Sequence, residues 1–188
     1  AWIRDLQTTG EDCLALNVWT PNLNVNAKRP VMVWLHGGGY FRGSGGAPGL
    51  DGGNLANAGD FVVVTLNHRL NTFGYTWFGD ADDRFADAGN AGMLDIVQAL
   101  EWVQDNIGAF GGDARNVTIF GQSGGGSKVA VMMATPRAKG LFHKAIIQSS
   151  SSHLQLATQE NAARSTHALL KALDLEGEGP EAVQKIPA

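Results

Sequence analysis

The feature that most constrains this chain is a serine flanked by glycines, set between an apolar, β-branched run and a run that can be helical. The stretch reads Asn-Val-Thr-Ile-Phe-Gly-Gln-Ser-Gly-Gly-Gly-Ser-Lys-Val and covers residues 116–129. A sharp strand-to-helix turn lifts the Ser123 hydroxyl out of the backbone, and the glycines let other chain segments pass close by. The stretch therefore predicts a strand, a tight turn that presents a serine, and a helix.

Further apolar runs predict a sheet around this strand. Runs typical of strands buried on both faces lie at residues 30–35, 61–66, 117–120 and 145–148. An alternating run at residues 14–20 is typical of one more strand.

Amphipathic helices are expected between these strands. Apolar residues recur at helical spacing after Asn90, a plausible N-cap, up to about Ile107. Residues 127–134 precede Pro136 and favour a second helix, and Thr158 is placed to cap a third. Residues 71–90 show no clear period and are expected to be irregular. Strands that alternate with helices predict an α/β fold with a mostly parallel central sheet and flanking helices.

The composition is that of one folded domain. Of 188 residues, 44% are hydrophobic and 17% charged, which excludes a disordered chain. The formal net charge is -4, without a basic patch, so nucleic acid is not expected as a partner. No apolar run is long enough to span a membrane, and no membrane partner is expected. The single cysteine, Cys13, permits no internal disulfide and no cysteine-based zinc site.

Two glycine-rich loops each follow a buried strand. His36-Gly37-Gly38-Gly39 ends the run at residues 30–35, and the turn at Ser123 ends the run at residues 117–120. Loops at the carboxyl ends of parallel strands converge on one crevice. They would supply a nucleophilic hydroxyl and unobstructed N–H groups for a tetrahedral oxyanion.

Other interpretations of these residues are weaker. The glycine spacing also fits a phosphate-binding loop, but that loop needs lysine before serine, and here the order is Ser127-Lys128. No Gly-x-Gly-x-x-Gly fingerprint for a dinucleotide occurs. His36 is better explained as ordering the glycine loop than as a base. Arg69 and Asp95 flank buried elements, and a structural ion pair is the better explanation for them.

In these motifs the chain resembles the type-B carboxylesterases, the α/β-hydrolase branch that includes cholinesterases and bacterial para-nitrobenzyl esterases. The matching stretches follow the family order over nearly the whole chain. They are residues 11–14, 17–21, 30–39, 67–70, 89–90 with 94–95, 102–106, 110–113, 116–125 and 140–149.

The resemblance implies a function and a set of site residues. Ser123 would be the acylated nucleophile, and the N–H groups of Gly38, Gly39 and Gly124 would form the oxyanion hole. Arg69 and Asp95 would be the family's buried ion pair. The reaction would be hydrolysis of a small carboxylic ester through an acyl-enzyme, with no metal and no organic cofactor.

The sequence departs from the family pattern at three positions. Gln122 stands where Glu is usual, Gly124 where Ala is usual, and His68 where Tyr is usual. None of these changes removes a group that the chemistry requires. Cys13 matches the second cysteine of a disulfide in secreted members, whose partner would lie upstream of this chain.

The resemblance also implies that the catalytic set is incomplete. The family's acid and histidine follow the serine well downstream. Here only His143, His153 and His167 follow, with Glu160 as the best-placed acid, and we expect none of them to complete a triad.

We therefore interpret residues 1–188 as the N-terminal to central part of a single α/β-hydrolase catalytic domain. Its partner would be the remainder of the same polypeptide or a complementary chain. An alternative hypothesis is a non-catalytic, cholinesterase-like adhesion protein on the same fold, although such proteins typically lose triad members.

Overall fold

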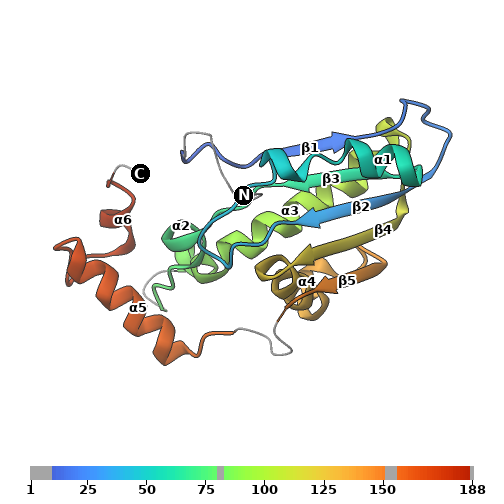
Figure 1. The fold of residues 1–188 in the computed structure, drawn as a ribbon. Coiled ribbons are helices and arrows are strands. Elements are labelled where there is room, and N and C mark those ends of the chain that lie inside the picture. The colour runs from blue at the N-terminus through green and yellow to red at the C-terminus, as the bar shows by residue number, and fades with distance from the viewer. Residues whose placement is uncertain (1–9, 80–82, 151–155, 187–188) are drawn as a thin grey trace.

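One mixed sheet organises the molecule. A computed structural model describes residues 10–79, 83–150 and 156–186 (Figure 1). Within them the sheet order is β1-β3-β2-β4-β5. The strands are β1 (Leu16–Trp19), β2 (Arg29–Leu35), β3 (Val62–Leu66), β4 (Gly112–Gln122) and β5 (Lys144–Gln148). β3, β2, β4 and β5 run parallel, and β1 pairs antiparallel with β3. The expected α/β fold with a mostly parallel sheet is confirmed.

Helices connect and cover the strands. The α-helices are α1 (Gly53–Gly59), α2 (Asn71–Tyr75), α3 (Ala91–Asn106), α4 (Gly124–Ala134), α5 (Gln159–Ala172) and α6 (Pro180–Val183). Short 3-10 turns occur at Pro48–Leu50, Asp83–Phe85, Ala88–Asn90, Ile107–Phe110 and Pro136–Ala138. In Figure 1, α5 and α6 lie beyond one end of the sheet, whereas α3 runs along it.

The core lies between the sheet and α3. The side chains of β2 that point inward, Val31, Val33 and Leu35, are fully buried. In α3, Ile96 and Leu100 are also fully buried, four residues apart on the face that meets the sheet. Burial of each such side chain stabilises the fold by about 1.5–3 kcal/mol. The apolar residues that recur at helical spacing after Asn90 are therefore the ones that α3 packs against the sheet.

Two sequence expectations were wrong. The segment expected to be irregular contains α2, a helix of five residues, which is too short to show a period of 3.6. The last strand, β5, was expected to be buried on both faces. Instead Ile146 and Ile147 are 43% and 46% exposed, because β5 pairs with β4 on one edge and with no other strand among the described residues.

The C-terminal helices are tied to the segment around α2 by polar contacts. The Thr158 hydroxyl accepts a hydrogen bond from the Asn161 N–H, which confirms Thr158 as the cap of α5. Thr166 donates its hydroxyl to the Trp77 carbonyl, and Arg84 pairs with Glu181.

Arg69 and Asp95, for which the resemblance implies a buried ion pair, lie in contact, although the Arg69 side chain is 43% exposed. Arg69 Nη2 lies 2.7 Å from Asp95 Oδ1, and the backbone N–H of Arg69 donates to Asp95 Oδ2 at 2.8 Å. The Asp95 side chain is only 5% exposed, so its charge depends on these donors. The hydrogen bond to Asp95 raises the pKa of Arg69. The pair joins the loop after β3 to α3.

Asp95→Asn is expected to lower the free energy of unfolding by about 1–3 kcal/mol, because charge-assisted hydrogen bonds to a buried carboxylate are lost. The control is Asp113→Asn, since Asp113 meets Arg115 at 3.4 Å with the arginine 86% exposed. That change should stay within about 0.5 kcal/mol. Chemical denaturation measures both, and equal losses would contradict the structural role of the Arg69–Asp95 pair.

Candidate active site

Ser123 occupies the sharp turn that the sequence predicts. It follows β4, caps the N-terminus of α4, and has φ 55° and ψ −124°. A residue other than glycine rarely adopts this backbone conformation, and such strain persists only where the surroundings enforce it. The Ser123 N–H donates to the Gln148 carbonyl at 2.9 Å, and its carbonyl accepts from Ser127 at 3.1 Å. The side chain itself is exposed at the end of the sheet.

Glycines around the turn create the space that the turn requires. A Cβ at Gly125 would lie 2.0 Å from the Leu35 carbonyl oxygen, and one at Gly121 would lie 2.5 Å from the Gly125 carbonyl carbon. Real Cβ atoms do not approach backbone atoms this closely. The first turn of α4 therefore packs directly on the end of β2, backbone against backbone.

The glycine loop after β2 reaches the same place. Gly38 and Gly39 have φ values of 97° and 67°, which favour glycine. A Cβ at Gly37 would lie 3.5 Å from the Ser123 Cβ, and one at Gly124 would lie 2.5 Å from the Gly39 nitrogen. The structure thus brings the serine beside the backbone of the residues that the sequence proposed as oxyanion donors. Gly124 in place of a larger residue lets the loop lie this close.

A buried lysine, which the sequence reasoning considered only as a phosphate ligand, lies under the loop. Lys128 is 0% exposed, and its Nζ donates to the carbonyl oxygens of His36 at 3.1 Å and Gly39 at 2.7 Å. It also lies 5.3 Å from the centroid of the Tyr40 ring. Burial lowers the pKa of Lys128 to about 7. An ammonium engaged in this way is turned from solvent, which argues against the phosphate-binding alternative.

Two histidines stack behind the loop. The rings of His36 and His68 lie 4.8 Å apart and nearly parallel, and both residues are 2% exposed. His36 Nδ1 lies 2.8 Å from the Gly37 carbonyl, so His36 orders the glycine loop as expected. His68 Nδ1 lies 3.0 Å from the Arg69 carbonyl, which assigns the proton of the neutral ring to Nδ1. Burial, with Lys128 and His36 nearby, lowers the pKa of His68 to about 2.

The downstream candidates for a triad do not reach Ser123. His143 Nδ1 accepts from the Val117 N–H at 3.2 Å, so it lies beside the middle of β4, roughly 20 Å along the strand from Ser123. His167 lies in α5 with its Nε2 3.7 Å from Glu176. Glu160 is in the first turn of the same helix. His153 lies outside the described residues.

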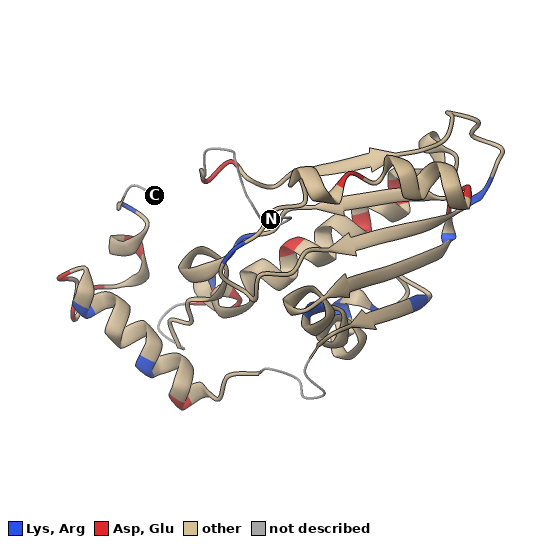
Figure 2. Cartoon of the chain, viewed as in Figure 1, with Lys and Arg blue, Asp and Glu red and all other residues tan. Residues whose placement is uncertain are grey.

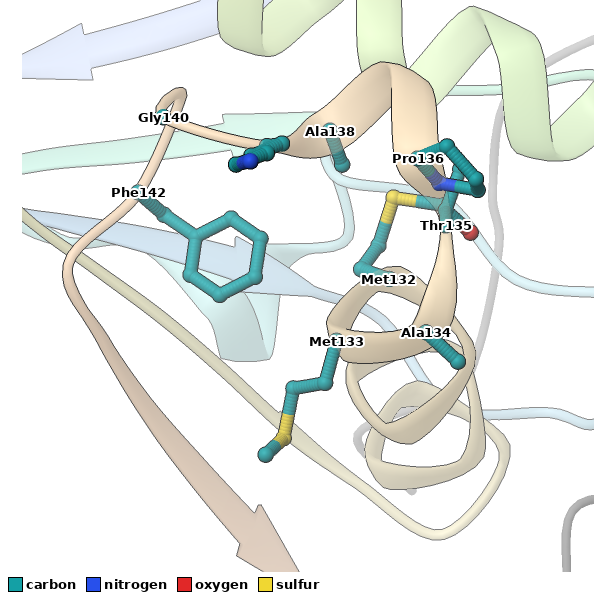
Figure 3. Close-up of a pocket in the computed structure, with 9 residues that line it drawn as sticks. Met132, Met133, Ala134, Thr135, Pro136, Ala138, Gly140 and Phe142 are labelled. Carbon is teal, nitrogen blue, oxygen red and sulfur yellow. The ribbon is translucent and has the colours of Figure 1, made fainter.

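A small pocket elsewhere on the chain is not the site (Figure 3). Its volume is about 240 Å³, below the usual range for small-molecule sites. Met133, Pro136 and Phe142 are among its lining residues, around the C-terminal end of α4. Ser123 is at the other end of that helix, about 15 Å away.

The charge distribution agrees with the composition. Figure 2 shows Lys and Arg interspersed with Asp and Glu along the described chain. None of the helices described is long and apolar enough to cross a bilayer. Within the same residues, His, Cys, Asp and Glu side chains form no group of three that could hold a metal ion.

Gly125→Ala is expected to lower the free energy of unfolding by more than about 2 kcal/mol, because the new Cβ would collide with the Leu35 carbonyl. Gly108→Ala is the matched control, since its Cβ would meet nothing within 4 Å. That variant should change stability by no more than about 0.5 kcal/mol. Thermal and denaturant unfolding measure both. A Gly125→Ala protein as stable as the control would show that the turn does not pack on β2.

The burial of His68 predicts how the free energy of unfolding depends on pH. Its folded pKa of about 2 lies below the ordinary 6.5, so between these values the unfolded chain binds a proton that the folded chain does not. Its contribution to the free energy of unfolding therefore falls below pH 6.5, at up to about 1.4 kcal/mol per pH unit. His68→Phe should remove that part of the slope between pH 6 and 4. His167→Phe, at an exposed position, should keep it. Equal slopes in both variants would contradict a buried neutral His68.

Comparison with known proteins gives the context for this geometry. The carboxylesterase family model matches residues 3–185. The chain is 45% identical to the para-nitrobenzyl esterase of Bacillus subtilis (strain 168) over 171 residues, which are 91% of this chain and 34% of that protein.

Solved structures agree with the sequence matches. A carboxylesterase from Geobacillus stearothermophilus superposes with a TM-score of 0.90 at 46% identity, over 94% of this chain and 37% of the other. An esterase from Clostridium hathewayi that can hydrolyze aliphatic aromatic polyesters superposes with a TM-score of 0.87 at 44% identity. The superposition covers 97% of this chain and 37% of that esterase.

The chain thus spans about a third of the length of the relatives that it matches. The match covers the strand, turn and helix around Ser123 and the glycine loop beside it. On these grounds the chain belongs to the carboxylesterase family.

Proposed function

We propose that this chain supplies the nucleophile and the oxyanion hole of a serine carboxylesterase, and that the catalytic histidine and acid lie outside it. The observation that carries the proposal is the strained, exposed Ser123 at the start of α4, with the Gly39 backbone against Gly124. The substrate class is a small carboxylic ester. No metal or organic cofactor enters the reaction.

The mechanism follows from this arrangement. The outside histidine takes the proton from the Ser123 hydroxyl while its oxygen bonds to the ester carbonyl carbon, and the carbonyl electron pair moves onto oxygen. The N–H groups of Gly38, Gly39 and Gly124 stabilise that oxyanion, each worth on the order of 10²–10³ in rate. Collapse expels the alcohol, which receives the proton from the histidine. Water then attacks the acyl-enzyme by the same route and releases the acid.

The unpaired outer edge of β5 supports the proposal that a further segment, outside this chain, completes the sheet. β5 ends beside the turn, because the Gln148 carbonyl accepts the Ser123 N–H. The outer edge of β5 pairs with no strand in the described part of the chain, and Ile146 and Ile147 are half exposed. A further strand of the same polypeptide or of a complementary chain would cover these side chains. Its carboxyl end would then lie at the same end of the sheet as Ser123.

The chain alone should therefore turn over esters slowly or not at all. A serine without a base is a poor nucleophile at neutral pH. The histidines downstream of Ser123 whose positions are described, His143 and His167, are engaged elsewhere. In this proposal residues 1–188 form one part of a single catalytic domain, and activity requires the rest of it.

In the complete protein, Ser123→Ala is expected to lower kcat for p-nitrophenyl acetate by about 10⁴–10⁶, because the acyl acceptor is removed. The wild-type protein should take up an organophosphate on Ser123, located by peptide mass mapping. Ser165→Ala, an exposed serine whose hydroxyl bonds the Asn161 carbonyl, is the control and should keep full activity. Labelling at any other residue, or activity that survives in Ser123→Ala, would exclude the proposed nucleophile.

A further inference from the structure

We propose that Lys128 is a positioning residue for the oxyanion hole, one that fastens both ends of the glycine loop to the helix that carries the nucleophile. The inference rests on the proposed function, since it assigns a task within that site. It stands on three features of the structure: the two carbonyls that Lys128 binds, the helix it belongs to, and its burial.

The two bound carbonyls bracket the oxyanion donors. Lys128 Nζ binds the His36 carbonyl oxygen, which precedes Gly37, and the Gly39 carbonyl oxygen, which precedes Tyr40. The proposed donors, the N–H groups of Gly38 and Gly39, belong to the two peptide groups between these carbonyls. One ammonium thus holds the peptide planes on either side of both donors.

The loop needs such a restraint because its own backbone is permissive. Residues 37–39 are all glycine, and two of them have positive φ. Glycine has the largest backbone freedom of any residue, so an N–H in such a segment is oriented only if side chains hold the loop. Among the peptide groups of the segment, the Gly37 carbonyl is held by His36 Nδ1 at 2.8 Å. Lys128 holds the groups at the two ends.

The position of Lys128 in α4 links these donors to the nucleophile. Ser123 caps this helix, Gly124 begins it, and Lys128 follows one turn later. The helix is buried from Gly124 to Val129, so this turn is fixed in place. The nucleophile, the third donor and the restraint on the other two therefore move as one rigid unit.

The burial of Lys128 costs free energy, because its ammonium group is removed from water. Its charge is desolvated, and it contacts two neutral carbonyls and the face of the Tyr40 ring. Within the described part of the chain, no ion pair joins Lys128 to a carboxylate, and the nearby His68 is neutral. The lowered pKa reflects this cost. An apolar side chain of similar length would fill the space without it, but could not bind the carbonyls.

The test compares Lys128→Met with Met132→Ala in the complete protein. Lys128→Met keeps the length of the side chain and removes the donors. Met132, at 1% exposure on the same helix, lies a turn further from the loop, so its truncation destabilises the fold without releasing the carbonyls. The readouts are kcat and KM for p-nitrophenyl acetate, and affinity for a trifluoromethyl ketone, which adds to the serine and places an oxyanion in the hole.

Lys128→Met should lower kcat and ketone affinity by about 10–100-fold, with KM within about threefold, since small displacements of oxyanion donors have effects of this size. Hydrogen exchange of the Gly38 and Gly39 amides should also accelerate. Met132→Ala should keep wild-type kcat and ketone affinity below its own unfolding transition. Both variants are expected to lose stability, but only Lys128→Met should lose kcat and ketone affinity. That difference separates a positioning role from a loss of stability.

Three results would overturn the inference: wild-type ketone affinity in Lys128→Met, an equal loss in Met132→Ala, or unchanged exchange at the two glycine amides. Lys128→Leu, made in parallel, guards against one variant failing to fold. If neither folds, Lys128 serves the whole domain and the positioning role is wrong. Failure of the proposed function is distinct, because it would appear as full activity in Ser123→Ala while the exchange measurement still reports on the loop.

Discussion

The backbone contact between the first turn of α4 and the end of β2 is the interaction on which the site depends. It is possible only because Gly121 and Gly125 have no side chains, so that the Leu35 carbonyl can lie where a Cβ would otherwise be. The contact fixes the direction in which the helix leaves the sheet. That direction in turn sets the strained conformation of Ser123 and places the glycine loop against Gly124. The geometry around Ser123 is thus a consequence of packing between two backbone segments.

The parts of this arrangement that follow from local pattern could be predicted from the sequence. The apolar run before Ser123, the glycines around it and the helical period of α3 each reflect contacts that are repeated along one element. The short helix α2 could not be found in this way, because five residues carry too little periodicity. The exposure of β5 depends on what lies next to it, and an apolar run such as Ala-Ile-Ile is the same whether or not its neighbour is present.

Lys128 illustrates a deeper limit of reasoning from local pattern. A lysine on a helix ordinarily predicts a solvated position. Its partners, the carbonyls of His36 and Gly39, are some ninety residues earlier in the chain, and backbone carbonyls leave no mark in a sequence. The available signal was indirect. Lys128 lies in a run of small and apolar residues that had to be buried for the turn at Ser123 to form.

The residues whose conformation or burial costs free energy are concentrated at the end of the sheet that carries the site. The strained serine, the desolvated lysine and the neutral, buried His68 all lie there, whereas the middle of the sheet is packed with valine, leucine and isoleucine. The stability of that apolar core is what allows the strained and polar groups to be held in place. Under the proposed function, such a division makes physical sense. In the proposed esterase, the core would hold the Ser123 hydroxyl and the N–H groups of the glycine loop in place before a base from outside the chain reaches the serine.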